Sequence, residues 1–420
     1  MTQLDLDAAL ANAHDTYADR RPRSAAMAAA AATVMPGGNT RTVLHFEPFP
    51  FRVERTEGSV LGDVDGHRCV DLLGNNTAGL FGHQVPAVRD AIVAQLDRGW
   101  AIGATHPLEI ELAALVCARF ESVEQVRFTN SGTEANLMAI GMAVHVTGRP
   151  TVLVFEDGYH GGVLSFAHGA GPLNVPHDFL LVPHNDVPAV EAAFVASGSS
   201  IACVVVEPVQ GSGGCIPAEP GLLEVLRRLC TDHDAVLIFD EVMTSRLHPG
   251  GAQARFGVLP DMTTLGNYPA GGMSFGAFGG RRSVMAAFDP AQGGALSQAG
   301  TFNNNVVSMA AGATAVRDVL TPEALIALND RGDQLRERLN TTFAGAGLPI
   351  TVIGVGSIMN LHSDDDRWVA LFFHAMLAAG IYLALRGMIA LALALALDVT
   401  DDQLDAFALA VECWSAEYSG

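Results

Sequence analysis

The chain carries a candidate phosphate-binding segment where an apolar run gives way to a helix. Ser131-Gly132-Thr133 follows the run VRF at 126–128, and Glu134 comes next, in the predicted first turn. Exposed N–H groups, a hydroxyl and the positive end of the helix dipole together favour a phosphate group at such a place. The same letters also fit an ordinary capping box, in which Ser131 and Glu134 satisfy N–H groups of the helix start. The segment alone leaves both interpretations open.

Two further pairs of polar residues suit a planar ligand that carries an oxygen atom. Tyr159 and His160 follow the run at 151–155 and have glycines on both sides, so a planar ring can stack there. A plain turn with two surface rings explains the same pair. Glu207 and Gln210 follow the next apolar run, where a carboxylate and an amide can orient a ligand oxygen or cap the glycine-rich loop.

Asp240 directly follows the apolar residues 235–239, which predicts a carboxylate that is partly buried. A buried carboxylate needs a partner, which is either an arginine or a cationic nitrogen of a ligand. Six glycines crowd the segment 264–281, and this density indicates close approach of the backbone to another group. The segment GTFNNN at 300–305 precedes another predicted helix and is a second candidate anion site.

These residues share a location because they follow the strands of one predicted sheet. Short β-branched runs alternate with helical patterns, which favours an α/β fold with a largely parallel sheet covered on both faces. Ligands of such sheets bind beyond the carboxyl ends of the strands. The predicted strands are 126–128, 151–155, 179–182, 202–207 and 235–239, and the predicted helices are 133–147, 187–196 and 220–233.

The pattern predicts a large α/β domain over 59–315 and a smaller α+β domain over 316–420, with residues 1–58 packing against the smaller one. Asp65-Gly66 predicts the turn of a hairpin near the start of the large domain. The elements expected in the smaller domain are helix 322–345, strands 350–354 and 357–361, helix 367–379, strands 381–384 and 388–396, and helix 401–416.

Composition disfavours several classes of protein. Hydrophobic residues make up 49% of the chain and charged ones 16%, which excludes a disordered chain. The net charge of −21 repels phosphate backbones and anionic lipids, so neither nucleic acid nor a membrane surface is an expected partner. The six cysteines form no CxxC pair and no zinc spacing, which predicts no metal site and a cytoplasmic location. The ten-residue apolar run Met388–Leu397 is too short to span a bilayer.

Taken together, the motifs resemble those of class III pyridoxal-phosphate-dependent aminotransferases. They occur in the same order over nearly the whole chain, and they are SGTEA at 131–135, YHG at 159–161, EPVQG at 207–211, DEV at 240–242, GGM at 271–273 and GTF at 300–302. The chain is most similar to the branch of glutamate-1-semialdehyde aminomutase. Within that branch, PGGNTRTVLHFEPFPF, DEVMTSRL and GTFNNNV look most like the β-phenylalanine (aromatic β-amino acid) aminotransferases.

The resemblance implies a fold type I homodimer with its active sites at the subunit interface. It assigns the cofactor phosphate to Ser131, Gly132 and Thr133, with Thr301 reaching across from the partner subunit. It assigns the cofactor ring to five residues, namely Tyr159 stacked on it, His160 beside it, Asp240 paired with the pyridine nitrogen, and Glu207 and Gln210 near the ring oxygen. The ligand expected there is pyridoxal 5'-phosphate or pyridoxamine 5'-phosphate.

The resemblance also implies two substrates, a β-amino acid and a 2-keto acid acceptor. Arg41 would bind the carboxylate of the β-amino acid, and Arg386 that of the acceptor. The planar fork of arginine matches a carboxylate in both roles. A surface or packing role remains the alternative for both arginines.

One position departs from the family pattern. The family's Schiff-base lysine follows the letters T-L-G, but here Thr264-Leu265-Gly266 is followed by Asn267. All 24 basic residues are arginines, so no other lysine can take its place. Coding bias explains arginine at surface positions, but not asparagine at position 267. An amide forms no imine with an aldehyde and is not a base near neutral pH, so the cofactor is expected to bind non-covalently.

Three hypotheses follow from Asn267. The chain is a transaminase whose lysine was substituted and whose activity is impaired or trapped. Alternatively, it is a non-catalytic homologue that binds a pyridoxal ligand or pairs with an active subunit. In the third hypothesis it is an aminomutase-like enzyme with altered pyridoxamine chemistry, in which Tyr159, His160 or water acts as the base.

Overall fold

The computed structural model describes residues 5–167, 169–291, 295–393 and 401–418. The chain divides into two compact units, one formed by Pro86–Ile326 and the other by Met1–Val85 together with Ala327–Gly420. The sequence placed these divisions at 58/59 and 315/316. Residues 60–71 join the unit that contains the chain ends because they form a sheet with a strand near residue 381.

The unit Pro86–Ile326 contains a seven-stranded sheet with the strand order β4-β12-β11-β10-β7-β5-β6. The strands in this order are β4 (Gln125–Thr129), β12 (Gly276–Gly280), β11 (Met262–Gly266), β10 (Val236–Asp240), β7 (Ile201–Val206), β5 (Thr151–Phe155) and β6 (Asp178–Val182). All neighbouring pairs from β11 to β6 are parallel, whereas β12 is antiparallel to both of its neighbours. The largely parallel sheet is therefore confirmed. β12 runs the other way because the short link after β11 cannot make a crossover.

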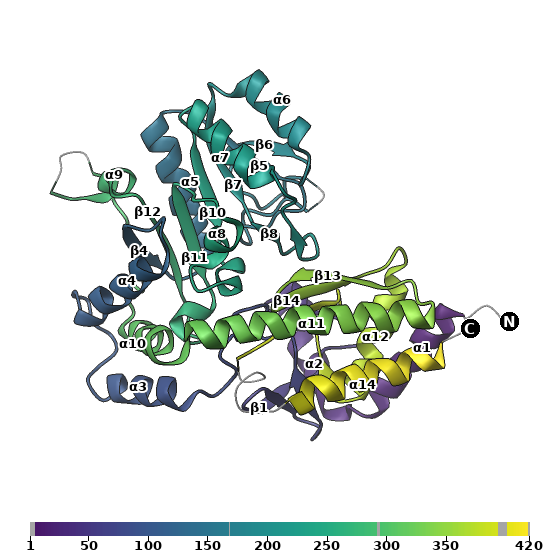
Figure 1. Ribbon diagram of the computed structural model, residues 1–420. Coiled ribbons are helices and arrows are strands. Elements are labelled where there is room, and N and C mark those ends of the chain that lie inside the picture. The colour runs from purple at the N-terminus through teal and green to yellow at the C-terminus, as the bar shows by residue number, and fades with distance from the viewer. Residues whose placement is uncertain (1–4, 168, 292–294, 394–400, 419–420) are drawn as a thin grey trace. The chain divides into compact units, whose positions relative to one another are not determined.

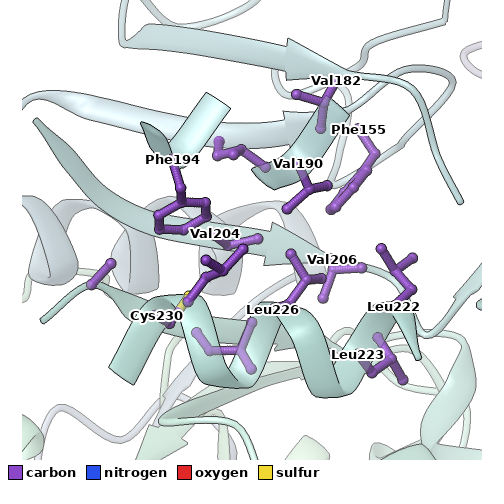
Figure 2. Close-up of a cluster of buried hydrophobic side chains, with 14 of the residues drawn as sticks. Phe155, Val182, Val190, Phe194, Val204, Val206, Leu222, Leu223, Leu226 and Cys230 are labelled. Carbon is purple, nitrogen blue, oxygen red and sulfur yellow. The ribbon is translucent and has the colours of Figure 1, made fainter. Parts of the chain in front are cut away.

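Helices cover both faces of this sheet (Figure 1), which explains why its strands are apolar without alternation. The helices are α5 (Gly132–Thr147), α6 (Val187–Ser197) and α7 (Leu222–Asp232). Figure 2 shows one face, where Phe194 of α6 and Leu226 of α7 pack against Val204 and Val206 of β7. The intervening Val205 points to the opposite face and packs in the cluster formed with α5.

Smaller elements complete this unit. They are α3 (Pro86–Leu96), α4 (Pro107–Arg119), β8 (Val209–Gln210), β9 (Ile216–Pro217), α8 (Gly251–Phe256), α9 (Arg282–Met285) and α10 (Val306–Thr314). α10 packs against α3 and α4, and β8 pairs with β9 in a short antiparallel ribbon.

The unit that contains the chain ends has two small sheets and five helices among its described residues. One sheet has the order β1 (Val53–Glu57), β2 (Val60–Asp63), β3 (Arg68–Asp71), β15 (Ile381–Tyr382), and the other β13 (Thr351–Val355), β14 (Ile358–His362), β16 (Met388–Ala390). The helices are α1 (Leu6–Asp19), α2 (Pro22–Ala32), α11 (Pro322–Ala346), α12 (Asp366–Ala378) and α14 (Asp401–Glu417), and α11 begins in the other unit.

The hairpin predicted at Asp65-Gly66 is present, since β2 and β3 pair antiparallel around a turn in which Gly66 has a φ of 92°. The predicted strand 388–396 is shorter than expected, because β16 ends at Ala390 and residues 394–396 lie outside the described part of the chain. Among the described helices, none is long and apolar enough to cross a bilayer.

Candidate active site

The start of α5 combines a capping box with a site for an anion. Ser131 is the N-cap residue, and its Oγ accepts a hydrogen bond from the Glu134 N–H at 3.2 Å. The Glu134 carboxylate in turn accepts the Asn130 N–H at 2.8 Å. The N–H groups of Gly132 and Thr133 are in the first turn and have no acceptor within the helix. The two interpretations of this segment are therefore compatible, because capping uses only part of the available donors.

Glycines bring the backbone close to this helix start. Gly161 has a φ of 130°, and a Cβ atom on it would lie 2.2 Å from the Thr133 Oγ1. A Cβ atom on Gly266 would lie 3.0 Å from the backbone of Gly132. Three segments thus pack closely at the start of α5, with no room for further side-chain atoms. Backbone N–H groups at a helix start are a favourable place for a phosphate group.

Asp240 lies at the carboxyl end of β10 and is 3% exposed. Its Oδ2 accepts hydrogen bonds from His160 Nδ1 and from Asn136 Nδ2, both at 2.8 Å, and its Oδ1 accepts the Val242 N–H at 3.0 Å. The sequence predicted that this carboxylate needs a partner, and the structure supplies these donors within one unit. No arginine is paired with Asp240 among the described residues.

The charges around Asp240 influence one another. Burial opposes the charged form of His160, but the hydrogen bond to Asp240 and the negative charges of Asp240 and Glu207 outweigh it and raise the pKa of the imidazole. Burial raises the pKa of the Glu207 carboxyl; His160 acts against that rise, and the charge of Asp240 adds to it. His160 and Asp240 therefore form a buried charge-assisted pair, with Glu207 as the neighbouring acid.

The residues expected near the cofactor ring lie at the same edge of the sheet. Glu207 directly follows β7, and its two carboxylate oxygens accept the N–H groups of Tyr159 and Gly211, each at 3.0 Å. Gln210 is buried in β8, and its Nε2 donates to the Glu156 carbonyl at 2.6 Å. Glu207 thereby positions the backbone that carries Tyr159, whose ring is 47% exposed and accessible to a ligand.

Asn267 directly follows β11, next to the strand that carries Asp240. Thr264 pairs in register with Asp240, and Gly266 ends the strand beside the start of α5. Asn267 is half-buried and has a φ of 66° and a ψ of −114°, a positive-φ conformation outside the αL region that glycine adopts more readily than other residues. A short turn at Tyr268–Ala270 follows it.

Thr301 lies in the turn that precedes α10 and is exposed. The same turn approaches the start of α5 of its own chain, because Asn130 Nδ2 donates to Asn303 Oδ1 at 2.9 Å. Asn304 Nδ2 also donates to the Ala104 carbonyl at 3.3 Å, which joins the turn to the loop before α4.

Arg41 and Arg386 belong to the unit formed by the chain ends, whereas the residues expected to bind the cofactor belong to the other unit. Both arginines are exposed. Arg41 Nη1 donates to Asn75 Oδ1 at 2.6 Å, and Arg386 Nη2 contacts Met388 Sδ at 3.1 Å. Both side chains keep exposed surface in the structure.

Comparison with known proteins identifies the family. The family model for aminotransferase class-III matches residues 44–412. The chain belongs to the class III aminotransferases. The β-phenylalanine transaminase of Variovorax paradoxus is 46% identical over 98% of this chain and 96% of its own length. A solved structure of a β-phenylalanine aminotransferase from that organism has a TM-score of 0.95 at 45% identity and covers 98% of each chain.

A solved transaminase with PLP bound is also similar to this aminotransferase chain, with 33% identity and a TM-score of 0.88 over 95% of this chain and 99% of its own. The fold type I assignment is therefore confirmed, and pyridoxal phosphate is the cofactor typical of the family.

The described residues fit the non-covalent contacts of that cofactor but not a covalent one. The start of α5 suits a phosphate, the exposed Tyr159 ring suits a planar group, and the buried Asp240 suits a protonated ring nitrogen. The chain contains no lysine, and residue 267 is an asparagine.

Sequence reasoning gave no role to Asn136, although the structure places it at the centre of the site. It is an amide on an apolar face of α5 and is 1% exposed. The signal in the sequence was a polar residue among alanines at helical spacing. Nothing in the neighbouring sequence indicated that the hydrogen-bond partner of Asn136 would be Asp240.

Proposed function

We propose that this aminotransferase binds pyridoxal phosphate or pyridoxamine phosphate non-covalently, and that its transamination of an aromatic β-amino acid is impaired. The observation that carries the proposal is Asn267 at the end of β11, in a chain without lysine, beside the residues proposed to contact the cofactor. Losing a positioned general acid–base typically lowers the rate by roughly 10²–10⁴-fold.

Each proposed cofactor residue has a physical task. Ser131, Gly132 and Thr133 bind the phosphate through N–H groups and hydroxyls at the positive end of α5. Asp240 holds a proton on the ring nitrogen, since a buried carboxylate favours a neighbouring cation. The bound cofactor supplies an electron sink for charge that develops at the substrate carbon.

Four further residues surround the ring in this proposal. Tyr159 covers one face, His160 lies beside it and shares the Asp240 carboxylate, and Glu207 and Gln210 lie towards the ring oxygen. Glu207 and Gln210 act by positioning the backbone to which they are bonded, because both make their described hydrogen bonds to main-chain groups.

The substrate assignment rests on the relatives and on two arginines. A protein that is 46% identical over nearly the whole chain is a β-phenylalanine transaminase. Arg41 would bind the carboxylate of the β-amino acid and Arg386 that of a 2-keto acid acceptor. Both guanidinium groups are exposed, as required for recognition of a diffusing carboxylate.

The proposal includes a homodimer. Trp100, Ile110 and Phe302 expose 62%, 75% and 65% of their area, respectively, which is unusual for large apolar side chains. The loop around residue 100 and the turn around residue 302 are linked by the Asn304–Ala104 hydrogen bond. A second copy covering these segments would bury the apolar side chains and bring the exposed Thr301 to the partner's phosphate site.

The decisive variant is Asn267→Lys, compared with the parent chain. With pyridoxal phosphate and 3-amino-3-phenylpropionate, we expect the variant to transaminate at least about 10²-fold faster, because it regains both the base and the amine. After borohydride reduction, intact mass should show one reduced cofactor on the variant and none on a side chain of the parent. Peptide mapping separates attachment at residue 267 from attachment at an N-terminal amine.

Asn267→Arg is the matched control, since it restores a positive charge of similar reach without a reactive amine. A parent chain that transaminates at the rate of Asn267→Lys would show that the activity is not impaired. If Asn267→Lys carries the reduced cofactor but converts no β-amino acid, the substrate assignment is wrong.

A further inference from the structure

The Asp240 carboxylate is held by an amide that the sequence motifs do not assign to the site. Asn136 Nδ2 donates two hydrogen bonds, one to Asp240 Oδ2 at 2.8 Å and one to the His160 carbonyl at 3.0 Å. One side chain of α5 thus connects the end of β10 with the loop after β5. Asn136 therefore fixes both the Asp240 carboxylate and the backbone of His160, whose imidazole bonds to the same carboxylate.

The other end of this amide is bonded to a hydroxyl. Thr264 Oγ1 lies 2.6 Å from Asn136 Oδ1 and donates to it. The reversed amide would place its NH₂ group against the hydroxyl and its oxygen against the Asp240 carboxylate, so acceptor would face acceptor. Asn136 and Thr264 are both buried, which protects these bonds from competition by solvent. The carboxylate therefore fixes which end of the amide faces it, and Thr264 anchors the amide oxygen.

These donors limit how many further hydrogen bonds the Asp240 carboxylate can accept. A carboxylate offers about four acceptor directions. Asn136 and His160 occupy both directions of Oδ2, and the Val242 N–H occupies one of Oδ1. One direction is left for a further donor, and it belongs to Oδ1.

We propose that Asn136, whose amide oxygen is anchored by Thr264, is a positioning residue that aims the one remaining acceptor direction of Asp240 at the protonated ring nitrogen of the cofactor. This inference rests on the proposed function, since it requires that the ring binds at Asp240. A proton shared between a ring nitrogen and a carboxylate lies on the more basic partner. Removing a donor from Asp240 makes the carboxylate more basic, so the proton moves from nitrogen to oxygen.

The charged groups that face Asp240 are His160, through its hydrogen bond, and Glu207. Substitution of Asn136 removes neither of these charged groups. A change in the protonation of the ring nitrogen then reports on the amide and not on the loss of a neighbouring charge.

The test uses the full chain with pyridoxamine 5'-phosphate labelled with ¹⁵N at the ring nitrogen. Asn136→Leu keeps the branched shape and removes both donors, and Thr264→Val removes the hydroxyl that anchors the amide. At neutral pH we expect the ¹⁵N chemical shift in Asn136→Leu to move towards the unprotonated value, with an affinity about tenfold weaker. Thr264→Val should change in the same direction by a smaller amount.

Thr263→Val is the matched control. Thr263 is the neighbouring residue on β11, is equally buried, and bonds to Ser122 and Gln253 on the other face of the sheet. It should lower thermal stability without changing the ¹⁵N shift. If Asn136→Leu behaves as Thr263→Val does, the amide only stabilises the fold and the inference is wrong.

Titration of the parent chain separates this inference from the proposed function. If that chain shows no saturable binding of pyridoxamine phosphate, both the proposed cofactor site and the inference are contradicted. If it binds and its ring nitrogen is unprotonated, Asp240 is not the partner of the nitrogen. Equal affinity and equal ¹⁵N shift in the parent and in Asn136→Leu contradict the inference alone.

Discussion

At the scale of single residues, the site depends on glycines, which permit close backbone contact, as much as on polar side chains. Gly161 illustrates this, because its positive φ and its approach to Thr133 exclude any side chain. The loop that carries Tyr159 and His160 therefore contacts the start of α5 directly. The same argument applies to Gly266, which precedes Asn267 and contacts Gly132.

Gly161→Ala is expected to disrupt this contact. Its Cβ atom would lie 2.2 Å from the Thr133 hydroxyl oxygen at a φ of 130°, so the loop must move away from the helix. We expect a loss of about 2 kcal/mol or more in the free energy of unfolding, with weaker binding of pyridoxamine phosphate. Urea unfolding and fluorescence titration measure the two effects. Gly162→Ala is the control, since a Cβ atom there meets nothing within 4 Å; equal behaviour of the two variants would contradict the contact.

At the scale of elements, α1 and α12 are joined by a cluster of aromatic rings and histidines within the unit formed by the chain ends. The His374 ring on α12 contacts the rings of His14 and Tyr17 on α1 at centroid distances of 4.7 and 5.9 Å. Burial, together with the positive charges of His14 and Arg21, lowers the pKa of His374 from 6.5 to about 4. The packing of these helices therefore requires a neutral imidazole.

The depressed pKa of His374 gives a pH dependence with a defined sign. Above pH 6.5 the imidazole is neutral in both states, and its contribution to stability is fully present. As the pH falls from 6.5 towards 4, the unfolded chain binds a proton that the folded chain does not, so stability is lost. His374→Phe should reduce this loss in the free energy of unfolding by about 2 kcal/mol, as measured by urea unfolding between pH 6.5 and 4. His145→Phe, at an exposed position on α5, is the control; an identical pH profile for parent and His374→Phe would refute the assignment.

At the scale of the whole molecule, the net charge and the exposed apolar surface have opposite effects on the association of two copies of the chain. A net charge of −21 makes copies of the chain repel one another, so association requires a large apolar contact and is favoured by salt. The exposed side chains of Trp100, Ile110 and Phe302 provide apolar surface in one unit. This is the surface on which the proposed homodimer depends.

Phe302→Asp is expected to weaken the proposed dimer by at least about tenfold in its dissociation constant, because it replaces apolar contact area with a charge. Light scattering after size-exclusion chromatography measures the mass across a dilution series. Val195→Asp on α6 is the matched control, since Val195 is 88% exposed and should remain so in the assembly. A parent chain that is monomeric at all concentrations would contradict the homodimer, and a dimer equally stable in both variants would place the interface elsewhere.

The sequence by itself determined the features that depend on short stretches of chain. Apolar runs predicted the strands β5, β7 and β10, and the capping letters predicted the start of α5. The Asp65-Gly66 turn predicted the β2–β3 hairpin, and the position of Asp240 predicted a buried carboxylate in need of partners. The absence of lysine at 267 is likewise a property of the sequence, as no arrangement of the chain can supply a lysine side-chain amine that it lacks.

Only the tertiary structure decided which distant residues satisfy one another. Asn136 and Asp240 are separated by 104 positions, and Asn136 and Thr264 by 128, so no local pattern links them. The sharing of one unit by both chain ends follows from the pairing of β15 with β3, two strands that are far apart in sequence. Burial is the physical reason in each case, because a polar group removed from water must bond to whatever the fold brings within reach, and local sequence does not specify that partner.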